Sequence, residues 1–361
     1  MSSLRILRII HDLQIGGVQR MMLRSARAMR ERGIETDICC LNINTHRAAD
    51  FEHAGFHVHL VPFKSRFDPI GLFNLRKILR HGRYDIAHSH MYAANMAVNI
   101  ALLGIKNIRI VNMYHSTRPG SSPGQIRMIT RTQKIPNRII AVSESVKEAL
   151  TNIGVAPSRI EIIYNGIEVP PVREHIPERS STAPIHLLWA GRFVKQKRIW
   201  FLVDVIDACR KAGIPVHLDL VGDGPTRAKM ERIVRERNLS DMVIFHEFST
   251  DIKKYIRAAD LFISASEREG FSNVLLEACA TGRGMILSDI PPHRELAHDS
   301  SAGIIAGDFP EGWAAIIKQL SVDRTRIHTM SEAAFHLAGH YSIENTISQL
   351  ITLYEQVLSL K

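Results

Sequence analysis

Residues 261–278 read LFISASEREGFSNVLLEA, an apolar run followed by a polar turn and a helical pattern. Glu269 precedes the turn Gly270-Phe271-Ser272-Asn273, and Glu277 is expected about two turns inside the following helix. The backbone N–H groups of 270–273 would then lie at a helix N-terminus, which favours anions and hydroxyl groups. The stretch therefore predicts a site where amides and two carboxylates hold a ligand rich in hydroxyl groups.

Three further loops follow apolar runs in the same way. Residues 187–190, LLWA, lead into GRFVKQK at 191–197, and residues 218–221, LDLV, lead into Gly-Asp-Gly-Pro at 222–225. Arg192 and Lys197 lie in the first loop, and two converging cations can neutralise a diphosphate. Gly16 and Gly17 follow the run at 6–10 and open a helix, where close backbone approach and the helix dipole favour a phosphate.

Strand-like and helix-like segments alternate along the whole chain, which predicts parallel βαβ units. The strands are expected at 6–10, 36–41, 57–61, 86–88, 108–112, 139–142, 185–190, 217–221, 243–245, 261–264, 285–288 and 302–305. Helices are expected near 18–32, 69–81, 91–104 and 144–153, between the later strands, and at 342–358, where the pattern is amphipathic. This order predicts an α/β protein with two Rossmann-like, doubly wound domains that bind ligands beyond the carboxyl ends of their strands and face each other across a cleft.

The length of 361 residues fits two domains of ordinary size. A polar, proline-bearing segment at 169–184 reads as a linker between residues 1–168 and 185–341. No apolar run approaches the roughly 18–20 residues that span a bilayer, and the N-terminus reads as a first strand instead of a signal peptide. Four cysteines without CxxC spacing fit free thiols in a reducing cytoplasm.

The net charge of +10 is concentrated in one half of the chain. Residues 1–170 hold 23 Lys and Arg against 12 Asp and Glu, a net +11, whereas residues 171–361 hold 23 against 24, a net −1. A basic half indicates a polyanionic partner. Arg20, Arg24 and Arg27 fall on one side of the first helix, so this helix is either an ordinary solvated face or a basic face for an anionic membrane or a lipid diphosphate.

The sequence gives no indication of a metal site. It contains no Asp-x-Asp, and the histidine pairs 57/59 and 88/90 lack the further ligands of a metal cluster. His115 ends the run at 110–114, at the expected mouth of the first domain, where a lone histidine is more often structural than catalytic.

As an ordered set, these segments resemble the retaining GT-B glycosyltransferases of family 4 (glycosyl transferases group 1), over nearly the whole chain. The resemblance implies that Arg192 and Lys197 contact the donor phosphates, that the Gly16-Gly17 loop faces the donor diphosphate and sugar, and that His115 reaches the transferred sugar. It also implies that the terminal helix, 342–361, crosses back onto the N-terminal domain. Arg198 departs from the pattern, which usually has glycine after the lysine.

The resemblance and the residues together predict metal-independent transfer of a sugar, with retention, from a nucleoside-diphosphate sugar to a hydroxyl acceptor. The donor is expected to be a UDP-sugar, with GDP-mannose next, bound through Arg192, Lys197, Glu269 and Glu277. No carboxylate is placed to attack the anomeric carbon, which favours a front-face route. The acceptor is expected in bacterial surface polysaccharide or lipid-linked glycan synthesis, with the enzyme in the cytoplasm or peripheral on the inner membrane face.

Two other functions remain open from the sequence. Epimerases that act on UDP-N-acetylglucosamine share the fold, although the glutamate pair and the Arg192–Lys197 loop favour transfer. An RNA-binding protein would use the basic half, but aromatic residues make up only 6% of the chain and are not interleaved with the basic ones.

Overall fold

The computed structural model describes residues 4–14, 16–43, 45–65, 68–173, 180, 183–297 and 301–360. The chain forms two compact units, one of residues 1–166 with 343–361 and one of residues 167–342. The C-terminal segment therefore belongs to the first unit. Half of the expected linker, residues 174–179, 181 and 182, lies outside the described part.

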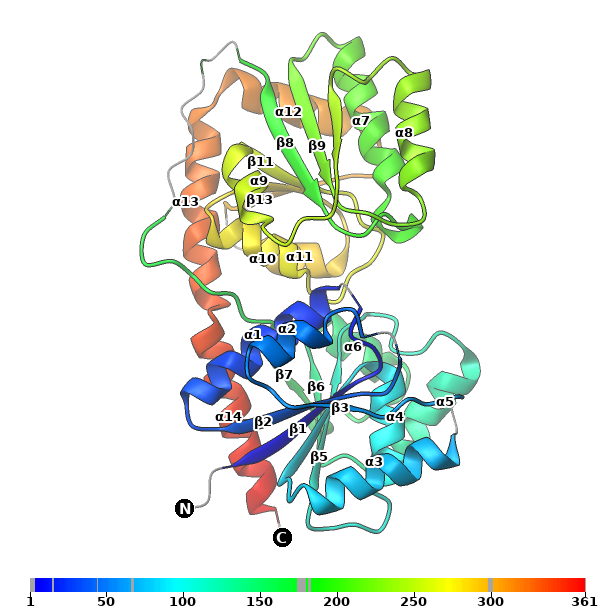
Figure 1. The fold of residues 1–361 in the computed structure, drawn as a ribbon. Coiled ribbons are helices and arrows are strands. Elements are labelled where there is room, and N and C mark those ends of the chain that lie inside the picture. The colour runs from blue at the N-terminus through cyan, green and yellow to red at the C-terminus, as the bar shows by residue number, and fades with distance from the viewer. Residues whose placement is uncertain are drawn as a thin grey trace. The chain divides into compact units, whose positions relative to one another are not determined.

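The first unit is built on seven parallel strands in the order β3-β2-β1-β4-β5-β6-β7, with helices on both faces (Figure 1). Its strands are β1 Arg5–Ile10, β2 Glu35–Cys40, β3 Val58–Leu60, β4 Ile86–His90, β5 Arg109–Tyr114, β6 Arg138–Ala141 and β7 Ile160–Ile162. Its helices are α1 Gly17–Glu31, α2 Ala48–His53, α3 Pro69–His81, α4 Met91–Ala101, α5 Pro123–Thr132, α6 Glu144–Asn152 and α14 Ile343–Ser359.

Five of the six residues of strand β1 are buried, and one of these five, Arg8, is charged. Alternate side chains point to opposite faces of a sheet, and Leu7 and Ile9 join the apolar cluster formed with α3 and α4. Ile10 joins the cluster with α1 and α2 on the other face. Arg8 points to this second face, where its guanidinium donates to the Met22 carbonyl at 3.2 Å and is fully buried.

Helix α14 completes the first unit by packing against α1. Thr346 donates from its hydroxyl to the Tyr164 carbonyl at 3.1 Å, and Tyr354 is fully buried with its hydroxyl 2.6 Å from His88 Nδ1. A Cβ at Gly166 would lie 2.8 Å from the Ile343 Cα, so the Asn-Gly turn at 165–166 lets the two segments approach closely.

The second unit is a sheet of six parallel strands in the order β10-β9-β8-β11-β12-β13. Its strands are β8 Ile185–Ala190, β9 Val216–Val221, β10 Val243–His246, β11 Leu261–Ser264, β12 Gly284–Ser288 and β13 Gly303–Ala306. Its helices are α7 Ile199–Lys211, α8 Arg227–Glu236, α9 Lys253–Ala258, α10 Asn273–Ala280, α11 Pro291–Ala297, α12 Pro310–Val322 and α13 Thr325–His340.

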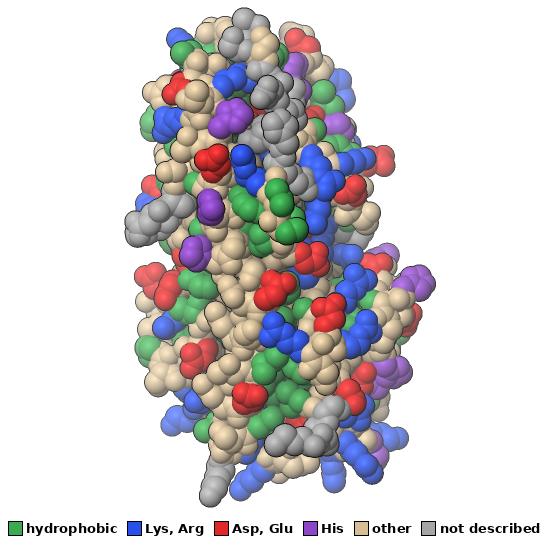
Figure 2. Space-filling view, turned by 90° about the vertical axis from the view of Figure 1, so that its left-hand side faces the viewer, with side chains coloured by type: hydrophobic (Ala, Val, Ile, Leu, Met, Phe, Trp, Pro, Cys, Tyr) green, Lys and Arg blue, Asp and Glu red, His purple; other side chains and the backbone are tan. Residues whose placement is uncertain are grey.

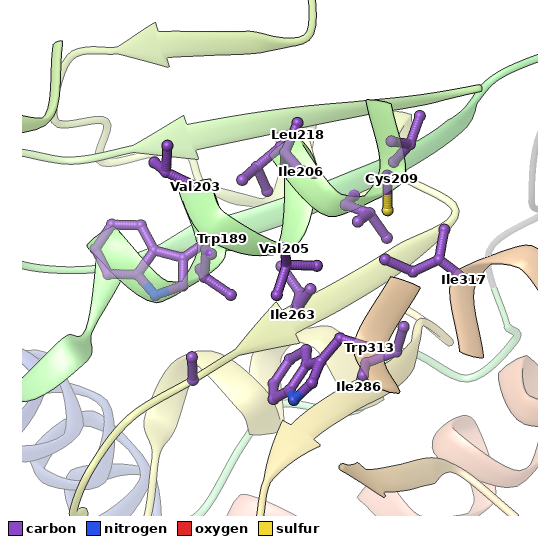
Figure 3. Packing of buried hydrophobic residues seen from close by; sticks show 14 of the residues in the cluster. Trp189, Val203, Val205, Ile206, Cys209, Leu218, Ile263, Ile286, Trp313 and Ile317 are labelled. Carbon is purple, nitrogen blue, oxygen red and sulfur yellow. The ribbon is translucent and has the colours of Figure 1, made fainter. Parts of the chain in front are cut away.

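Aromatic rings anchor the core of the second unit, where α7 and α12 pack on the sheet (Figure 3). Trp313 meets Phe201 edge to face at 5.5 Å between ring centroids, and its indole N–H donates to the Gly307 carbonyl at 2.7 Å. Trp189 packs in the same way against Phe193 at 5.1 Å. Phe193 lies three residues after the end of β8, so this contact fixes the start of the loop that holds Arg192.

The expected alternation of strands and helices is confirmed. The expected strand at 261–264 and helix at 69–81 have the predicted bounds, whereas β4 runs on to His90, which pairs with Ile10 of β1 and Met113 of β5. The short helices α2 and α5 were not expected. None of the described helices is long and apolar enough to cross a membrane.

Candidate active site

Each sheet places some of the predicted residues at its switch point, where the strand order reverses. In the first unit this point lies between β1 and β4, and in the second between β8 and β11. Doubly wound sheets bind ligands at the carboxyl ends of these strands. Gly16 follows β1, Lys197 follows β8 and Glu269 follows β11.

Lys197 and Glu269, 72 residues apart, form an ion pair between the loops after β8 and β11. Their side chains are only 20% and 12% exposed. Ser266 donates from its hydroxyl to the same Glu269 oxygen at 2.8 Å. Burial alone would raise the pKa of Glu269, but the Lys197 ammonium and the Ser266 hydroxyl together hold this pKa below its usual value. The carboxylate is therefore ionised and held in one place.

Gln196 joins the same two loops through its main chain and its side chain. Its amide Nε2 donates to the Arg268 carbonyl at 2.6 Å, and its own carbonyl accepts from the Glu267 N–H at 2.9 Å. No sequence motif indicated Gln196, because a glutamine between two lysines forms no motif of its own. These bonds set the distance between the loop after β8, residues 191–198, and the loop after β11, residues 265–272. The first is called the cation loop below and the second the glutamate loop.

His293 is a second residue of this region that no sequence motif indicated. It is 1% exposed on α11, and its Nδ1 lies 3.0 Å from the Ser288 carbonyl. The Ser288 hydroxyl in turn donates to the Ser266 carbonyl at 2.6 Å. Burial lowers the pKa of His293 to about 4, although the Glu269 carboxylate acts in the opposite direction. The neutral His293 therefore supports the glutamate loop through Ser288.

The backbone geometry of the cation loop is unusual at two points. A Cβ at Gly222 would lie 2.0 Å from the Gly191 carbonyl oxygen, so the loops after β8 and β9 touch at backbone distance. Arg198 takes φ 50° and ψ 43°, the left-handed conformation that suits the glycine of the family pattern. Its guanidinium stacks on Phe201 at 4.6 Å and pairs with Asp308 at 2.5 Å. Arg192 itself is exposed.

Helix α10 begins at Asn273 after Ser272, which takes extended backbone angles and makes no capping hydrogen bond from its side chain. The predicted amide site therefore lies at a helix N-terminus that the Ser272 side chain does not cap. Glu277 is the fifth residue of α10, so it lies about one turn inside the helix and not two. It is 4% exposed. Phe271 is 6% exposed and packs on the Tyr341 ring at 5.0 Å between centroids, so its side chain belongs to the core.

In the first unit, Gly16 and Gly17 lie where the sequence places them. Gly16 is the N-cap of α1 in an extended conformation, and α1 begins at Gly17 with no acidic residue in its first turn. The Gln19 amide donates back to the Asp12 carbonyl at 3.2 Å and so braces the loop.

His115 follows β5 and lies against His90, the last residue of β4, with 3.1 Å between His115 Nε2 and His90 Nδ1. The two rings stack at 5.4 Å between centroids. Burial, and secondarily the Arg8 charge, lower the pKa of His115 to about 3. The site histidine is therefore neutral at physiological pH.

The expectation of a basic stripe on α1 is corrected by the structure. Arg24 donates to the Gly166 carbonyl at 3.0 Å, and both it and Arg20 are half-buried. Of the three arginines only Arg27 is exposed. On the face drawn in Figure 2, Lys and Arg side chains are interspersed with Asp and Glu. Across the described ranges, no three His, Cys, Asp or Glu side chains gather as a metal site would require.

Comparisons with known proteins agree with this arrangement. Residues 15–169 match the model of Glycosyltransferase Family 4, and residues 184–323 match that of Glycosyl transferases group 1. The chain is 24% identical to the capsular polysaccharide biosynthesis glycosyltransferase CapH of Staphylococcus aureus, over 97% of this chain and 98% of CapH. It is 26% identical to the GDP-mannose:cellobiosyl-diphosphopolyprenol alpha-mannosyltransferase of Xanthomonas oryzae, over 62% and 59% of the two chains.

Among solved structures, Anabaena HepE in complex with UDP-glucose matches with a TM-score of 0.85 at 18% identity, over 98% of this chain and 99% of HepE. At that identity the match shows the fold alone. Two parallel, doubly wound sheets and two family models that between them take in most of the sequence lead to one conclusion: the chain is a GT-B glycosyltransferase of family 4, glycosyl transferases group 1.

Proposed function

We propose that this glycosyltransferase transfers a sugar, with retention and without a metal ion, from a UDP-sugar to a hydroxyl acceptor. The observation that carries the proposal is the constellation at the β8–β11 switch point. It combines an exposed cation, Arg192, with the Lys197–Glu269 pair and the buried Glu277 on helix α10. Cations suit a diphosphate leaving group, and carboxylates suit the hydroxyls of a ribose and a sugar.

Retention would follow a front-face route in which the enzyme stabilises the departing diphosphate. Glu269 is already engaged by Lys197 and Ser266 and is not proposed as a nucleophile. Metal independence rests on the absence of Asp-x-Asp from the sequence and on the two cations of the loop after β8. Activity should persist in excess EDTA, and the anomeric configuration of the product can be read by proton NMR. Loss of activity in EDTA that Mg²⁺ or Mn²⁺ restores would contradict the metal-independent route.

The donor is tested by a thermal-shift panel of UDP-, GDP- and ADP-sugars. A ligand at a hundredfold excess over its Kd stabilises the protein by about 2.7 kcal/mol, so the preferred base stands out. UDP-sugars are expected first and GDP-mannose second, since relatives named above are described as acting on GDP-mannose or are solved with UDP-glucose. A shift with none of the nucleotide sugars would contradict the proposed donor class.

The acceptor is proposed to belong to a lipid-linked glycan or a surface polysaccharide, as the names of the relatives suggest. A lipid-linked acceptor would bring the enzyme to an anionic membrane surface. The exposed side of α3 suits this contact better than α1. Ile70 and Phe73 are each 66% exposed there, and Lys77 and Arg80 continue the same stripe at helical spacing. Apolar side chains flanked by cations fit an anionic lipid surface.

A further inference from the structure

A chain of buried polar side chains crosses the first unit from β1 to the end of β5. Arg8 on β1 directs its Nε and Nη2 atoms at His90 Nε2, at 3.4 Å and 3.2 Å. His90, at the end of β4, contacts His115 through Nδ1 and Nε2 at 3.1 Å. Arg8 and His90 are fully buried. Buried polar groups in such a chain must satisfy one another, so their proton positions are linked.

The direction of this chain follows from the chemistry of the guanidinium group. Arginine has only N–H donors, so the Nε2 atom of His90 must accept. A neutral imidazole carries one proton, which in His90 must then lie on Nδ1. This N–H donates to Nε2 of His115, and the single proton of His115 must in turn lie on its own Nδ1.

Both histidines are neutral, as this assignment requires. Burial lowers the pKa of His90 well below its usual value, and the neighbouring His88, Arg8 and His115 lower it further. Burial lowers the pKa of His115 to about 3. Arg8 stays charged at neutral pH, since burial lowers its pKa only to about 10.

The two ends of this series of hydrogen-bonded side chains, Arg8 and His115, differ in their surroundings. Arg8 is anchored on its far side by the Met22 carbonyl and by the Ser25 hydroxyl at 2.5 Å. At the other end, His115 Nδ1 is buried and has no hydrogen-bond partner among the described residues. A buried N–H without an acceptor destabilises the protein, and a ligand oxygen that accepts from it would offset this cost. Met91, directly after His90, has φ 69°, a strained backbone that fixes the β4–α4 junction.

We propose that Arg8 and His90 are positioning residues that hold His115 as a neutral Nδ1–H donor to a hydroxyl oxygen of the transferred sugar. This inference rests on the proposed function, because it takes the sugar as the ligand of His115. It assigns His115 the role of a hydrogen-bond donor and not of a general base, since its Nε2 lone pair is occupied by His90 and its Nδ1 already carries the proton.

The proton positions can be measured without any substrate. Two-bond nitrogen–proton NMR correlations of the full chain labelled with ¹⁵N-histidine distinguish the two neutral tautomers. We expect His90 and His115 of the wild-type protein to carry the proton on Nδ1 at neutral pH, with His115→Gln used to assign the signal. A His115 that is charged, or that carries its proton on Nε2, would overturn the proposal whatever the activity.

Two substitutions at one position separate positioning from general disruption of the core. In His90→Asn the amide N–H takes the place of Nδ1–H and should keep the His115 tautomer, whereas His90→Leu should release it into a mixture. Tyr354→Phe is the matched control, because it removes a buried hydroxyl from the adjacent His88 without touching the chain. An unchanged His115 signal in His90→Leu would refute the role of His90.

Turnover with the donor found by thermal shift tests the sugar contact. We expect kcat/KM to fall roughly tenfold in His90→Leu and less than about threefold in His90→Asn, the scale of one uncharged hydrogen bond. Equal values in both variants, with the tautomers as expected, would show that the sugar does not use the Nδ1–H. If the wild-type protein transfers no sugar, the proposed function fails, while the NMR result still decides whether Arg8 and His90 set the tautomer.

Discussion

Lys197 and Arg192 are both assigned to the donor diphosphate, but the structure gives them different surroundings. Replacing either with alanine should weaken UDP binding by roughly 1.5–3 kcal/mol, the scale of a charged hydrogen bond, and leave uridine binding unchanged. Only Lys197→Ala should also lower the melting temperature, because it leaves the Glu269 carboxylate buried without its cation. Calorimetric titration and thermal unfolding measure the two effects. Equal UDP affinity in wild type and both variants would show that these two cations do not bind the diphosphate.

The two glutamates should divide their roles. Glu277→Gln should cost roughly 1–2 kcal/mol of affinity for uridine and UDP alike, because its carboxylate is assigned to the ribose. Glu269→Gln should leave uridine binding unchanged and reduce turnover. Since it also frees Lys197 from its partner, its UDP affinity should stay level or rise. Titrations with uridine and UDP distinguish the cases, and a loss of uridine affinity in Glu269→Gln would show that Glu269 is misplaced.

His293 links the stability of the second unit to pH. Its pKa is lowered to about 4 in the folded state, whereas an unfolded histidine titrates near 6.5. Its contribution is therefore fully present above pH 6.5 and is lost as pH falls through 4, by about 3 kcal/mol in total. Unfolding by urea between pH 7 and 4 should show a shallower pH dependence in His293→Gln than in wild type. The same slope in both proteins would mean that this histidine is not buried in neutral form.

At the scale of elements, the turn from the cation loop into α7 offers a sharp test. A protein with alanine at or near the start of a helix is normally more stable than one with glycine there. The backbone of Arg198, however, is in the left-handed conformation, in which a Cβ costs about 1–2 kcal/mol. Arg198→Gly should therefore be more stable than Arg198→Ala by roughly 1 kcal/mol, since both lose the contacts with Phe201 and Asp308. Differential scanning calorimetry compares the two variants, and the usual order of alanine above glycine would contradict the left-handed assignment.

Elements were predictable where one local pattern governs them. The strand at 261–264 and the helix at 69–81 are bounded by local signals, and the Asp68 side chain does accept from the Ile70 N–H as an N-cap. The depth of Glu277 was misjudged, since the four residues from Asn273 to Glu277 make only about one turn at 3.6 residues per turn. The Lys197–Glu269 pair and the Arg8–His90 contact join residues 72 and 82 apart. The hydrophobic periodicity of the sequence does not reveal such pairings, because they depend on which strands become neighbours in the sheet.

At the scale of the whole molecule, the uneven charge leads to a test of the membrane contact proposed above. Lys77→Glu with Arg80→Glu on α3 should release the protein from anionic vesicles, since each cation near the surface contributes about 1 kcal/mol. Co-sedimentation with and without anionic lipid, at low and high salt, measures this. Phe73→Gln should weaken binding at both salt concentrations, because its contribution is apolar.

The matched control makes the same charge change on the other unit. Lys229→Glu with Arg235→Glu alters two exposed residues of α8, in the half whose net charge is −1, and should leave vesicle binding as in wild type. Equal release by both double variants would point to overall charge and away from α3. If sedimentation does not depend on lipid charge, α3 is an ordinary solvated helix and not a membrane-binding surface.

The return of α14 to the first unit determines the order in which a ribosome can finish the two units. Residue 166 is synthesised 177 positions before residue 343, an interval of roughly 10–35 s at ordinary rates of translation. Throughout that time the nascent first unit lacks the helix that covers His88 and packs on α1. The unit translated first is therefore the one completed last, and its exposed face is open to chaperones and proteases while the second unit folds.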